Sequence, residues 1–260
     1  MRCYAGTHGK YTLPDPAPPP LPPHTHRRPR PRRAGLEPFV SQVLRDGDAV
    51  LTAGYCPNVV SFLRHVAAAF PLDVIVADGG PRAPGRATAA ALSVTKRGVA
   101  AIVTMTPDTG VWALLSAGGA RRVILPASAI ARDGSVVAPA GALAIALAAQ
   151  HFSIPVVIVA TSAKFSPAET AASIYARGGG DAALQGPPSD VLAYADAVEL
   201  AAAGARAASH ASEGVRVLHT VFDVLPAALS SLIVTSAGVV TPGSTWRLVD
   251  EIFGRPAPPL

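Results

Sequence analysis

The sequence has few cysteines, few aromatic side chains and few charges. Of its 260 residues, two are cysteines, 5% are aromatic and 15% are charged. Cys3 and Cys56 cannot form a disulfide framework, which indicates a reducing compartment. Long apolar runs are also lacking. Mean hydropathy is +0.35, yet no stretch reaches 18 uncharged apolar residues, and the strongest run, 154–160, is strand-sized. The sequence therefore predicts no membrane-spanning segment and no membrane partner.

Half of the residues are apolar, which is ample material for a core. The positive charge lies almost entirely at one end. Residues 1–34 contain seven basic residues against one acid, a balance of +6, whereas the rest has 15 basic and 16 acidic residues, a balance of −1. A neutral body with few aromatic residues argues against direct binding of nucleic acid.

The N-terminal segment is rich in proline and arginine. Residues 14–33 read PDPAPPPLPPHTHRRPRPRR. Proline removes hydrogen-bond donors and the arginines repel one another, so this composition cannot build a core. It predicts a disordered Pro/Arg-rich tail over residues 1–35. A docking arm for SH3-type or anionic partners is the sharper alternative. A transit peptide fits less well because serine is scarce.

From residue 37 onward, short apolar runs alternate with helix-length segments. Strands are expected over 49–55, 73–78, 100–105, 122–126, 155–160 and 231–235. Helices are expected over 59–70, 86–97, 108–117, 141–151 and 242–253. This order predicts an α/β domain over residues 36–260 with a Rossmann-like, doubly wound parallel sheet. Residues 162–190 contain Pro and Gly breaks and are interpreted as a long surface loop.

One glycine-rich segment has the spacing of a phosphate-binding loop. Residues 80–88 read GPRAPGRAT and follow the second expected strand. Arg86 replaces the lysine of a P-loop, and two prolines remove amide donors, which argues against a nucleotide site. A tight turn at Gly85 that begins a helix is favoured. A small anion could still bind there, because Arg82 and Arg86 lie beside the positive helix end.

Other chemical signals are weak. The histidines lack metal-ligand spacing, so no metal site is predicted. Cys56 follows the first strand without a base nearby, which favours a packed thiol over a nucleophile. Asp108, after Pro107, fits a helix start, and Asp133-Gly134 is a hairpin-turn signal. Lys164 lies just past a strand, either solvated or facing a pocket.

Four segments of the sequence read AVLTAGYCPNVVSFL (49–63), DVIVADGGPRAPGRA (73–87), RRVILPASAIARDGSVVAPAGALAIALAAQHFSIPVVIVATSAKFSP (121–167) and FDVLPAALSSLIVTSAGVVTPGSTWRLVDEIF (222–253). Together they resemble the regulatory subunits of translation initiation factor 2B and the related sugar-phosphate isomerases. They follow the order and spacing of that family. VSFL, HTVFDVLP and TWRLVDEIF are most similar to the beta subunit, whereas AGVVTP is more alpha-like.

The resemblance implies a non-catalytic subunit of the guanine-nucleotide exchange factor that recharges initiation factor 2 with GTP. It implies as partners alpha- and delta-like regulatory subunits, gamma- and epsilon-like catalytic subunits, and initiation factor 2, all in the cytosol. No cofactor is implied. The family's regulatory subunits carry a helical domain before the α/β domain, and here only residues 1–48 precede the first strand.

The related isomerases provide the alternative function. They resemble one another in a Cys-Asn-Thr-Gly turn after the first strand and a Gly-Ala-Asp-Arg turn after the fourth. Here the first turn is 55–58, Tyr-Cys-Pro-Asn, with the cysteine out of register, and the acid position of the second turn is Ser128. Since proton transfer between sugar carbons needs an acid, isomerase activity is not expected. A non-catalytic sugar-phosphate or nucleotide pocket, lined by Arg82, Gly85, Arg86 and Lys164, stays open.

An assembly surface is expected near the C-terminus. The final helix has an apolar stripe widened by Trp246, and tryptophan and arginine are enriched at binding hot spots. Thr241 is expected to cap this helix. The expected interface residues are Phe222, Leu225, Pro226, Leu229, Trp246, Arg247, Val249 and Phe253. The alternative is that the helix only covers its own sheet.

Overall fold

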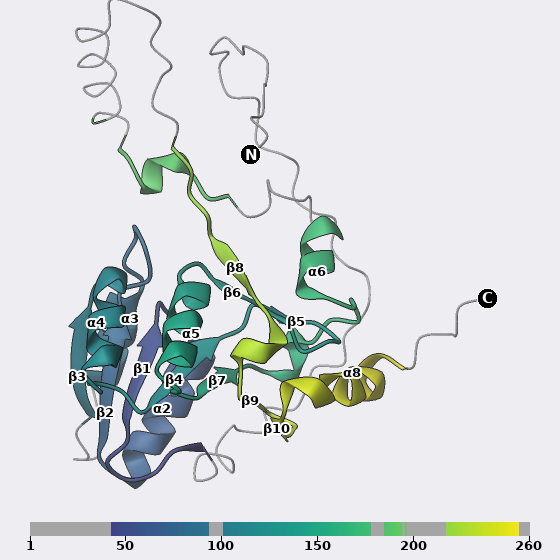
Figure 1. Ribbon diagram of the computed structural model, residues 1–260, viewed down its shortest axis with the longest axis horizontal. Coiled ribbons are helices and arrows are strands. Elements are labelled where there is room, and N and C mark those ends of the chain that lie inside the picture. Colours follow the sequence, from purple (N-terminus) through teal and green to yellow (C-terminus); the bar gives the residue numbers. More distant parts are fainter. Residues whose placement is uncertain (1–42, 94–100, 178–184, 194–195, 197–216, 255–260) are drawn as a thin grey trace, which may run out of the picture. The chain divides into compact units, whose positions relative to one another are not determined.

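A computed structural model describes residues 43–93, 101–177, 185–193, 196 and 217–254, all within the compact unit Pro31–Leu260 (Figure 1). The tail expected over 1–35 lies outside the described residues. A seven-stranded sheet organises the described part. Its order is β10 (Gly238–Val240), β9 (Leu232–Thr235), β7 (Val156–Val159), β4 (Arg122–Pro126), β1 (Ala49–Ala53), β2 (Leu72–Ala77) and β3 (Ala101–Thr106).

The predicted doubly wound sheet is confirmed. Six strands are parallel, and their chain order across the sheet, 3-2-1-4-5-6, is that of the Rossmann fold. The seventh strand, β10, was not predicted. It pairs antiparallel with β9, because the chain turns back at once after Thr235, whose hydroxyl donates to the carbonyl of Gly238.

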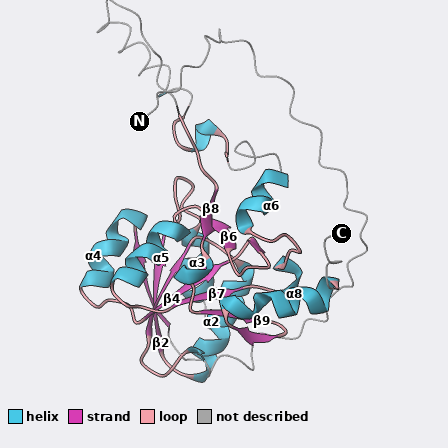
Figure 2. Ribbon diagram, turned by 45° about the vertical axis from the view of Figure 1, so that its right-hand side comes forward, coloured by secondary structure: helices cyan, strands magenta, loops and turns pink. Residues whose placement is uncertain are grey.

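Helices cover both faces of this sheet, as Figure 2 shows. On one face lie α2 (Pro57–Ala69) and α3 (Gly85–Ser93), and on the other lie α4 (Val111–Ser116), α5 (Ala142–His151) and α8 (Thr245–Phe253). The strands are apolar on both sides. Val50 packs toward α2, whereas its neighbour Leu51 packs toward α4 and α5, and both are fully buried. This pattern is why the strands appear as continuous apolar runs.

A second, three-stranded antiparallel sheet was not predicted. It contains β5 (Ala129–Ile130), β6 (Val136–Pro139) and β8 (Phe222–Leu225). The predicted turn at Asp133-Gly134 is confirmed, since it connects β5 to β6. The strands are two to four residues long, and β8 pairs with β6 from 83 to 89 positions away, so no local sequence pattern indicates this pairing.

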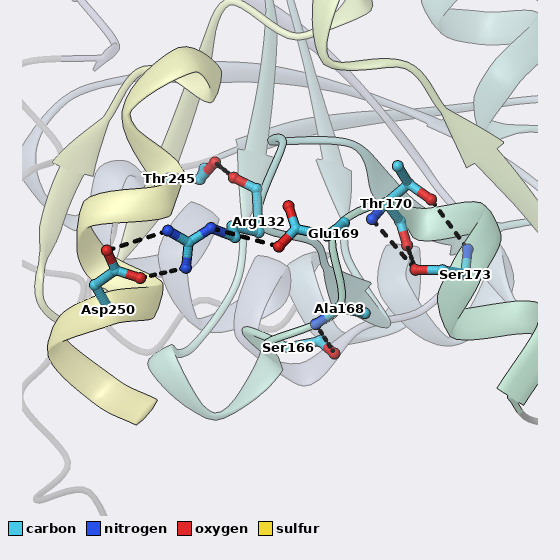
Figure 3. Close-up of polar contacts among 8 residues, drawn as sticks. All are labelled: Arg132, Ser166, Ala168, Glu169, Thr170, Ser173, Thr245 and Asp250. Atoms are coloured by element: carbon cyan, nitrogen blue, oxygen red, sulfur yellow. Dashed lines mark hydrogen bonds and ion pairs between the residues drawn. The ribbon is translucent and has the colours of Figure 1, made fainter. Parts of the chain in front are cut away.

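The prediction of a continuous surface loop over 162–190 is wrong. This stretch contains 3-10 turns at Ser162–Lys164 and Pro188–Asp190, and a helix α6 (Ala171–Arg177). Thr170 and Ser173 exchange side-chain to backbone hydrogen bonds at the start of α6, in the manner of a capping box (Figure 3). The Thr-x-x-Ser spacing was therefore the missed signal.

The C-terminal helix begins later than predicted. Residues Pro242–Ser244 form a 3-10 turn, a further 3-10 turn lies at Ala227–Leu229, and α8 starts at Thr245. Thr241 does not cap a backbone amide through its side chain, as its hydroxyl lies 3.0 Å from that of Ser244 instead.

Gly85 allows α3 to start against the end of β2. A Cβ at this position would lie 2.4 Å from the carbonyl oxygen of Ala77. We expect Gly85→Ala to lower the free energy of unfolding by about 1–3 kcal/mol, the usual cost of overpacking. Chemical denaturation would measure this loss. Gly243→Ala is the control, because a Cβ there meets nothing within 4 Å. Equal stability of the two variants would contradict this account.

Candidate functional site

The carboxyl edge of the parallel strands is where ligands bind in doubly wound sheets. β1 and β4 are neighbours at the point where the strand order reverses, so the loops after them flank the expected crevice. The loops after β2 and β3 adjoin it.

The glycine turn after β2 already holds an anionic group, the side chain of Asp108. Gly79 donates to Asp108 Oδ1 at 2.9 Å and Gly80 donates to Oδ2 at 2.7 Å. Both glycines have left-handed backbone, with φ of 83° and 88°, which turns their amides to the same side. The prediction that Asp108 marks a helix start is therefore incomplete. It opens a 3-10 turn, Asp108–Gly110, but its carboxylate reaches the neighbouring loop.

The start of α5 lies close to this carboxylate. A Cβ added at Gly141, the residue before α5, would lie 3.8 Å from Asp108 Oδ2. A second acid, Asp223 of β8, accepts a hydrogen bond from the amide of Leu143 in the first turn of α5. Two carboxylates thus accept hydrogen bonds from backbone amides at this edge. Asp108 accepts from the two glycines, and Asp223 accepts from the amino end of α5.

The four residues predicted for an anion pocket do not gather at one point. Arg82 forms an ion pair with Asp190 at 2.6 Å, and Asp190 lies 3.5 Å from His219 Nδ1. Lys164 follows β7, which is three strand spacings from β2, or about 14 Å. The structure therefore separates Lys164 from Arg82.

The other two predicted pocket residues lie at the start of α3. Gly85 is buried, and its amide donates to the carbonyl of Asp78. Arg86 is exposed. Gly85 thus serves the turn that begins the helix, as the favoured interpretation of this segment predicted.

A small cavity of about 90 Å³ lies at the reversal point between β1 and β4. Its walls are Ala53, Gly54, Tyr55, Gly79, Pro84, Leu125, Pro126, Pro139, Ala140 and Ala142. These described residues include no carboxylate, amine, imidazole or thiol. Because small-molecule sites usually measure about 300–1,000 Å³, the cavity is too small for a sugar phosphate.

Cys56 and Ser128, from the two turns compared with the isomerases, do not line this cavity. Cys56 directly precedes α2, is half-buried, and packs against the apolar cluster beneath α2 and α3. Ser128 follows β4, and its amide donates to the carbonyl of Val137 in β6. Among the residues that the structure describes, no three His, Cys, Asp or Glu side chains are grouped as a metal site requires.

The predicted interface residues divide into buried and exposed groups. Leu225, Leu229 and Val249 are at most 8% exposed and belong to the core under α5 and α8. They support the fold and contribute no surface in this chain. Phe222 is half-buried and packs against the small cluster formed by Ala131, Val137 and Ala171.

The exposed group lies mostly on α8. It consists of Pro226, Trp246, Arg247 and Phe253. The guanidinium of Arg247 lies 5.2 Å from the ring centre of Trp246, within the range of a cation–π contact.

α8 is fixed by a set of polar contacts that the sequence analysis missed (Figure 3). Both nitrogens of the Arg132 fork contact Asp250 of α8, and Arg132 Nε lies 3.7 Å from Glu169. Thr245 Oγ1 lies 2.8 Å from the carbonyl oxygens of Arg132 and Pro242. Bidentate Arg–carboxylate pairs fix orientation as well as distance. The hairpin between β5 and β6 therefore sets how α8 presents its outer side.

Removal of the Asp108 carboxylate leaves two amides without an acceptor. We expect Asp108→Ala to lower the free energy of unfolding by about 1.5–3 kcal/mol, the range for hydrogen bonds to a charged group. Asp108→Asn keeps one acceptor oxygen and should lose less. Thermal and chemical unfolding would rank the variants, with Asp46→Asn, an exposed carboxylate, as the control. Wild-type stability of Asp108→Ala would contradict this role.

Comparison with known proteins identifies the family. A sequence profile of the Initiation factor 2 subunit family matches residues 30–242. Translation initiation factor eIF2B subunit beta of Dictyostelium discoideum is 26% identical over 210 residues, which cover 81% of this chain and 48% of that protein. Ribose 1,5-bisphosphate isomerase of Haloterrigena turkmenica is 28% identical over 220 residues, 82% of this chain and 60% of that protein. The chain spans about half the length of the beta subunits it matches.

Solved structures share the fold. The eIF2B delta subunit from A. fulgidus has a TM-score of 0.65 at 21% identity. This match covers 85% of this chain and 61% of the delta subunit chain. The tetrameric eIF2B-beta2-delta2 complex from C. thermophilum has a TM-score of 0.57 at 19% identity. This match covers 84% of this chain and 58% of the chain in that complex. Because the family profile matches well over half of the chain, this protein belongs to the Initiation factor 2 subunit family.

Proposed function

We propose that this chain is a non-catalytic, beta-like regulatory subunit of the guanine-nucleotide exchange factor that returns initiation factor 2 from its GDP form to its GTP form. The observation that carries the proposal is the match to beta subunits of two organisms across 81% of the chain. Its cytosolic location and its partners belong to the same proposal. The partners are alpha- and delta-like regulatory subunits, gamma- and epsilon-like catalytic subunits, and initiation factor 2.

The geometry of the carboxyl edge supports a role without catalysis. An aldose–ketose isomerase needs an acid and a base within reach of adjacent sugar carbons. Here the cavity at the reversal point is small and lacks ionisable groups apart from the phenol of Tyr55. The glycine amides that could receive a phosphate are occupied by Asp108.

The second candidate is a sugar-phosphate isomerase, favoured by 28% identity to a ribose 1,5-bisphosphate isomerase. Measuring turnover of ribose 1,5-bisphosphate and methylthioribose 1-phosphate by the purified full chain distinguishes the isomerase from the regulatory subunit. We expect no product above that formed by Ser128→Ala, because Ser128 cannot act as the general acid at neutral pH. Turnover that Ser128→Ala abolishes would replace the regulatory proposal with the isomerase.

The exposed residues Trp246, Arg247 and Phe253 of α8 form the proposed contact with a delta-like partner. Trp246 is 39% exposed and Phe253 is 43% exposed, whereas Leu248 and Val249 on the inner side are buried. Phe253 lies one turn after Val249, so the apolar stripe continues beyond the part that covers the sheet. Arg247 adds a charge beside Trp246, and tryptophan and arginine dominate binding hot spots.

Trp246→Ala should weaken association with a co-expressed delta-like subunit by about 2–4 kcal/mol, a hot-spot magnitude. The fold should survive, because the side chain is partly exposed. Calorimetric titration would measure the affinity, and Trp112→Ala, another exposed tryptophan, is the matched control. Undiminished binding, or unfolding of the isolated variant, would contradict the proposed contact.

A further inference from the structure

A groove of about 380 Å³ lies along α2, beside the last turn of α3. All of its lining residues except Val60 and Ala91 are exposed, so the groove is open to solvent. Since a helix rises about 1.5 Å per residue, the stretch of α2 from Pro57 to Ala68 is about 16 Å long. This length matches about five residues of extended chain. The lining residues are Tyr55, Pro57, Val60, Ser61, Arg64, His65, Ala68 and Ala91.

The guanidinium of Arg64 is held in place beside this groove. Its Nε donates to the carbonyl of Ala91 at 3.0 Å, and its Nη2 donates to the same oxygen. Ala91 lies in the last turn of α3, where carbonyls lack partners within the helix, so the contact also ties the two helices together. A guanidinium has five N–H donors, so three remain, including both on Nη1. Arg64 is therefore fixed in orientation and keeps donors for a ligand.

No carboxylate of the described residues forms an ion pair with Arg64. Three other arginines, Arg82, Arg122 and Arg132, each pair with an aspartate. The helices beside the groove offer no such partner, because neither α2 nor α3 contains Asp or Glu. Within the described part of the chain, Arg64 thus combines a fixed position with a charge that no acid compensates.

Acidic residues are also lacking in the chain around the groove. No Asp or Glu occurs over 49–72 or over 79–107. Between these stretches lie Asp73 and Asp78, and neither lines the groove. Because Val74 packs in the cluster under α2, the preceding Asp73 points to the opposite face of the sheet. An acidic ligand would therefore meet no like charge on α2 or α3.

We propose that this groove binds an acidic peptide segment of a partner protein, with a carboxylate of that segment on the guanidinium of Arg64. Arginine and carboxylate pair through two parallel hydrogen bonds, which suits a guanidinium that is already oriented. The hydroxyls of Tyr55 and Ser61 are further donors in the groove, and Pro57 and Val60 add apolar surface for a neighbouring side chain of the peptide. The open, elongated shape favours a peptide over a small molecule, which a pocket usually encloses.

A phosphate-bearing ligand fits this groove less well. Phosphate sites at helix starts use free backbone amides. Here the first residue of α2 is Pro57, which has no N–H, and the amide of Val60 donates to the carbonyl of Cys56. The groove thus offers side-chain donors that suit a carboxylate and lacks a cradle of amides at this helix start.

The groove is distinct from the proposed contact on α8. α2 packs on one face of the seven-stranded sheet, whereas α8 packs on the other. A chain can therefore use both surfaces at once. Binding of the peptide does not depend on the proposed regulatory function, and it is tested without any other subunit.

An array of synthetic five-residue peptides, each with a central glutamate between apolar residues, would be probed with the purified full chain. The peptides that bind would be labelled, and their affinities measured by fluorescence anisotropy. We expect replacement of the central glutamate by glutamine to weaken binding roughly 10-fold or more, because the charged hydrogen bonds to Arg64 are lost. Inorganic phosphate, compared with chloride at equal ionic strength, should not displace the peptide.

Two variants of the groove should show a similar loss, again roughly 10-fold or more. Arg64→Gln removes the guanidinium, whereas Ala68→Glu adds a like charge to the groove and keeps the contact between Arg64 and Ala91. The matched control is Arg86→Gln, because this exposed arginine of α3 does not line the groove and its loss should leave the affinity unchanged. Thermal unfolding of each variant checks that the fold is kept.

Several results would overturn the proposal. The first is that no peptide of the array binds, or that glutamine replaces the glutamate without loss. Equal loss in Arg64→Gln and Arg86→Gln would indicate a diffuse effect of positive charge, and unchanged affinity in Ala68→Glu would place the peptide elsewhere. Displacement by inorganic phosphate would indicate a phosphate ligand in place of the acidic peptide.

Discussion

The carboxylate of Asp108 joins the loops that follow β2 and β3, and the shape of the carboxyl edge depends on this contact. Backbone amides in a left-handed glycine turn form a concave site for an anion. Here an internal carboxylate fills that site at 2.7–2.9 Å and also lies beside the start of α5. A phosphate would have to displace a group that the fold itself supplies. The edge therefore has the geometry of an anion site, but its glycine amides bind a carboxylate of the chain itself and so stabilise the fold.

Charged residues are also scarce in the segment that contributes β6, α5 and β7. Residues 134–163 build β6, α5 and β7 without one Asp, Glu, Lys or Arg. Strands buried on both faces require such a composition. A helix that covers a sheet requires it only on its inner side, so the uncharged outer side of α5 is not explained by the core. The outer side of α5, with Leu147 49% exposed, therefore carries more apolar surface than the core requires.

The sequence predicted the parts of the structure that rest on local patterns. Apolar runs identified all six parallel strands, and Asp133-Gly134 identified the hairpin between β5 and β6. It did not predict contacts between distant residues. Nothing local to Asp108 indicates Gly79 as its donor, and Arg132 meets Asp250 from 118 positions away. The sequence also did not indicate which apolar residues are buried. Val249 and Phe253 lie on the same stripe of α8, yet only Val249 reaches the core.

The last turn of α8 shows how anchoring and exposure are linked. Arg132 holds Asp250, and Thr245 is tied to the backbone of the β5–β6 hairpin, so the first two turns of the helix have a fixed orientation. Beyond Asp250 the helix continues for three residues, of which Ile252 and Phe253 are 41% and 43% exposed. The Arg132–Asp250 pair and the Thr245 contact thus fix the orientation in which α8 carries these exposed apolar side chains.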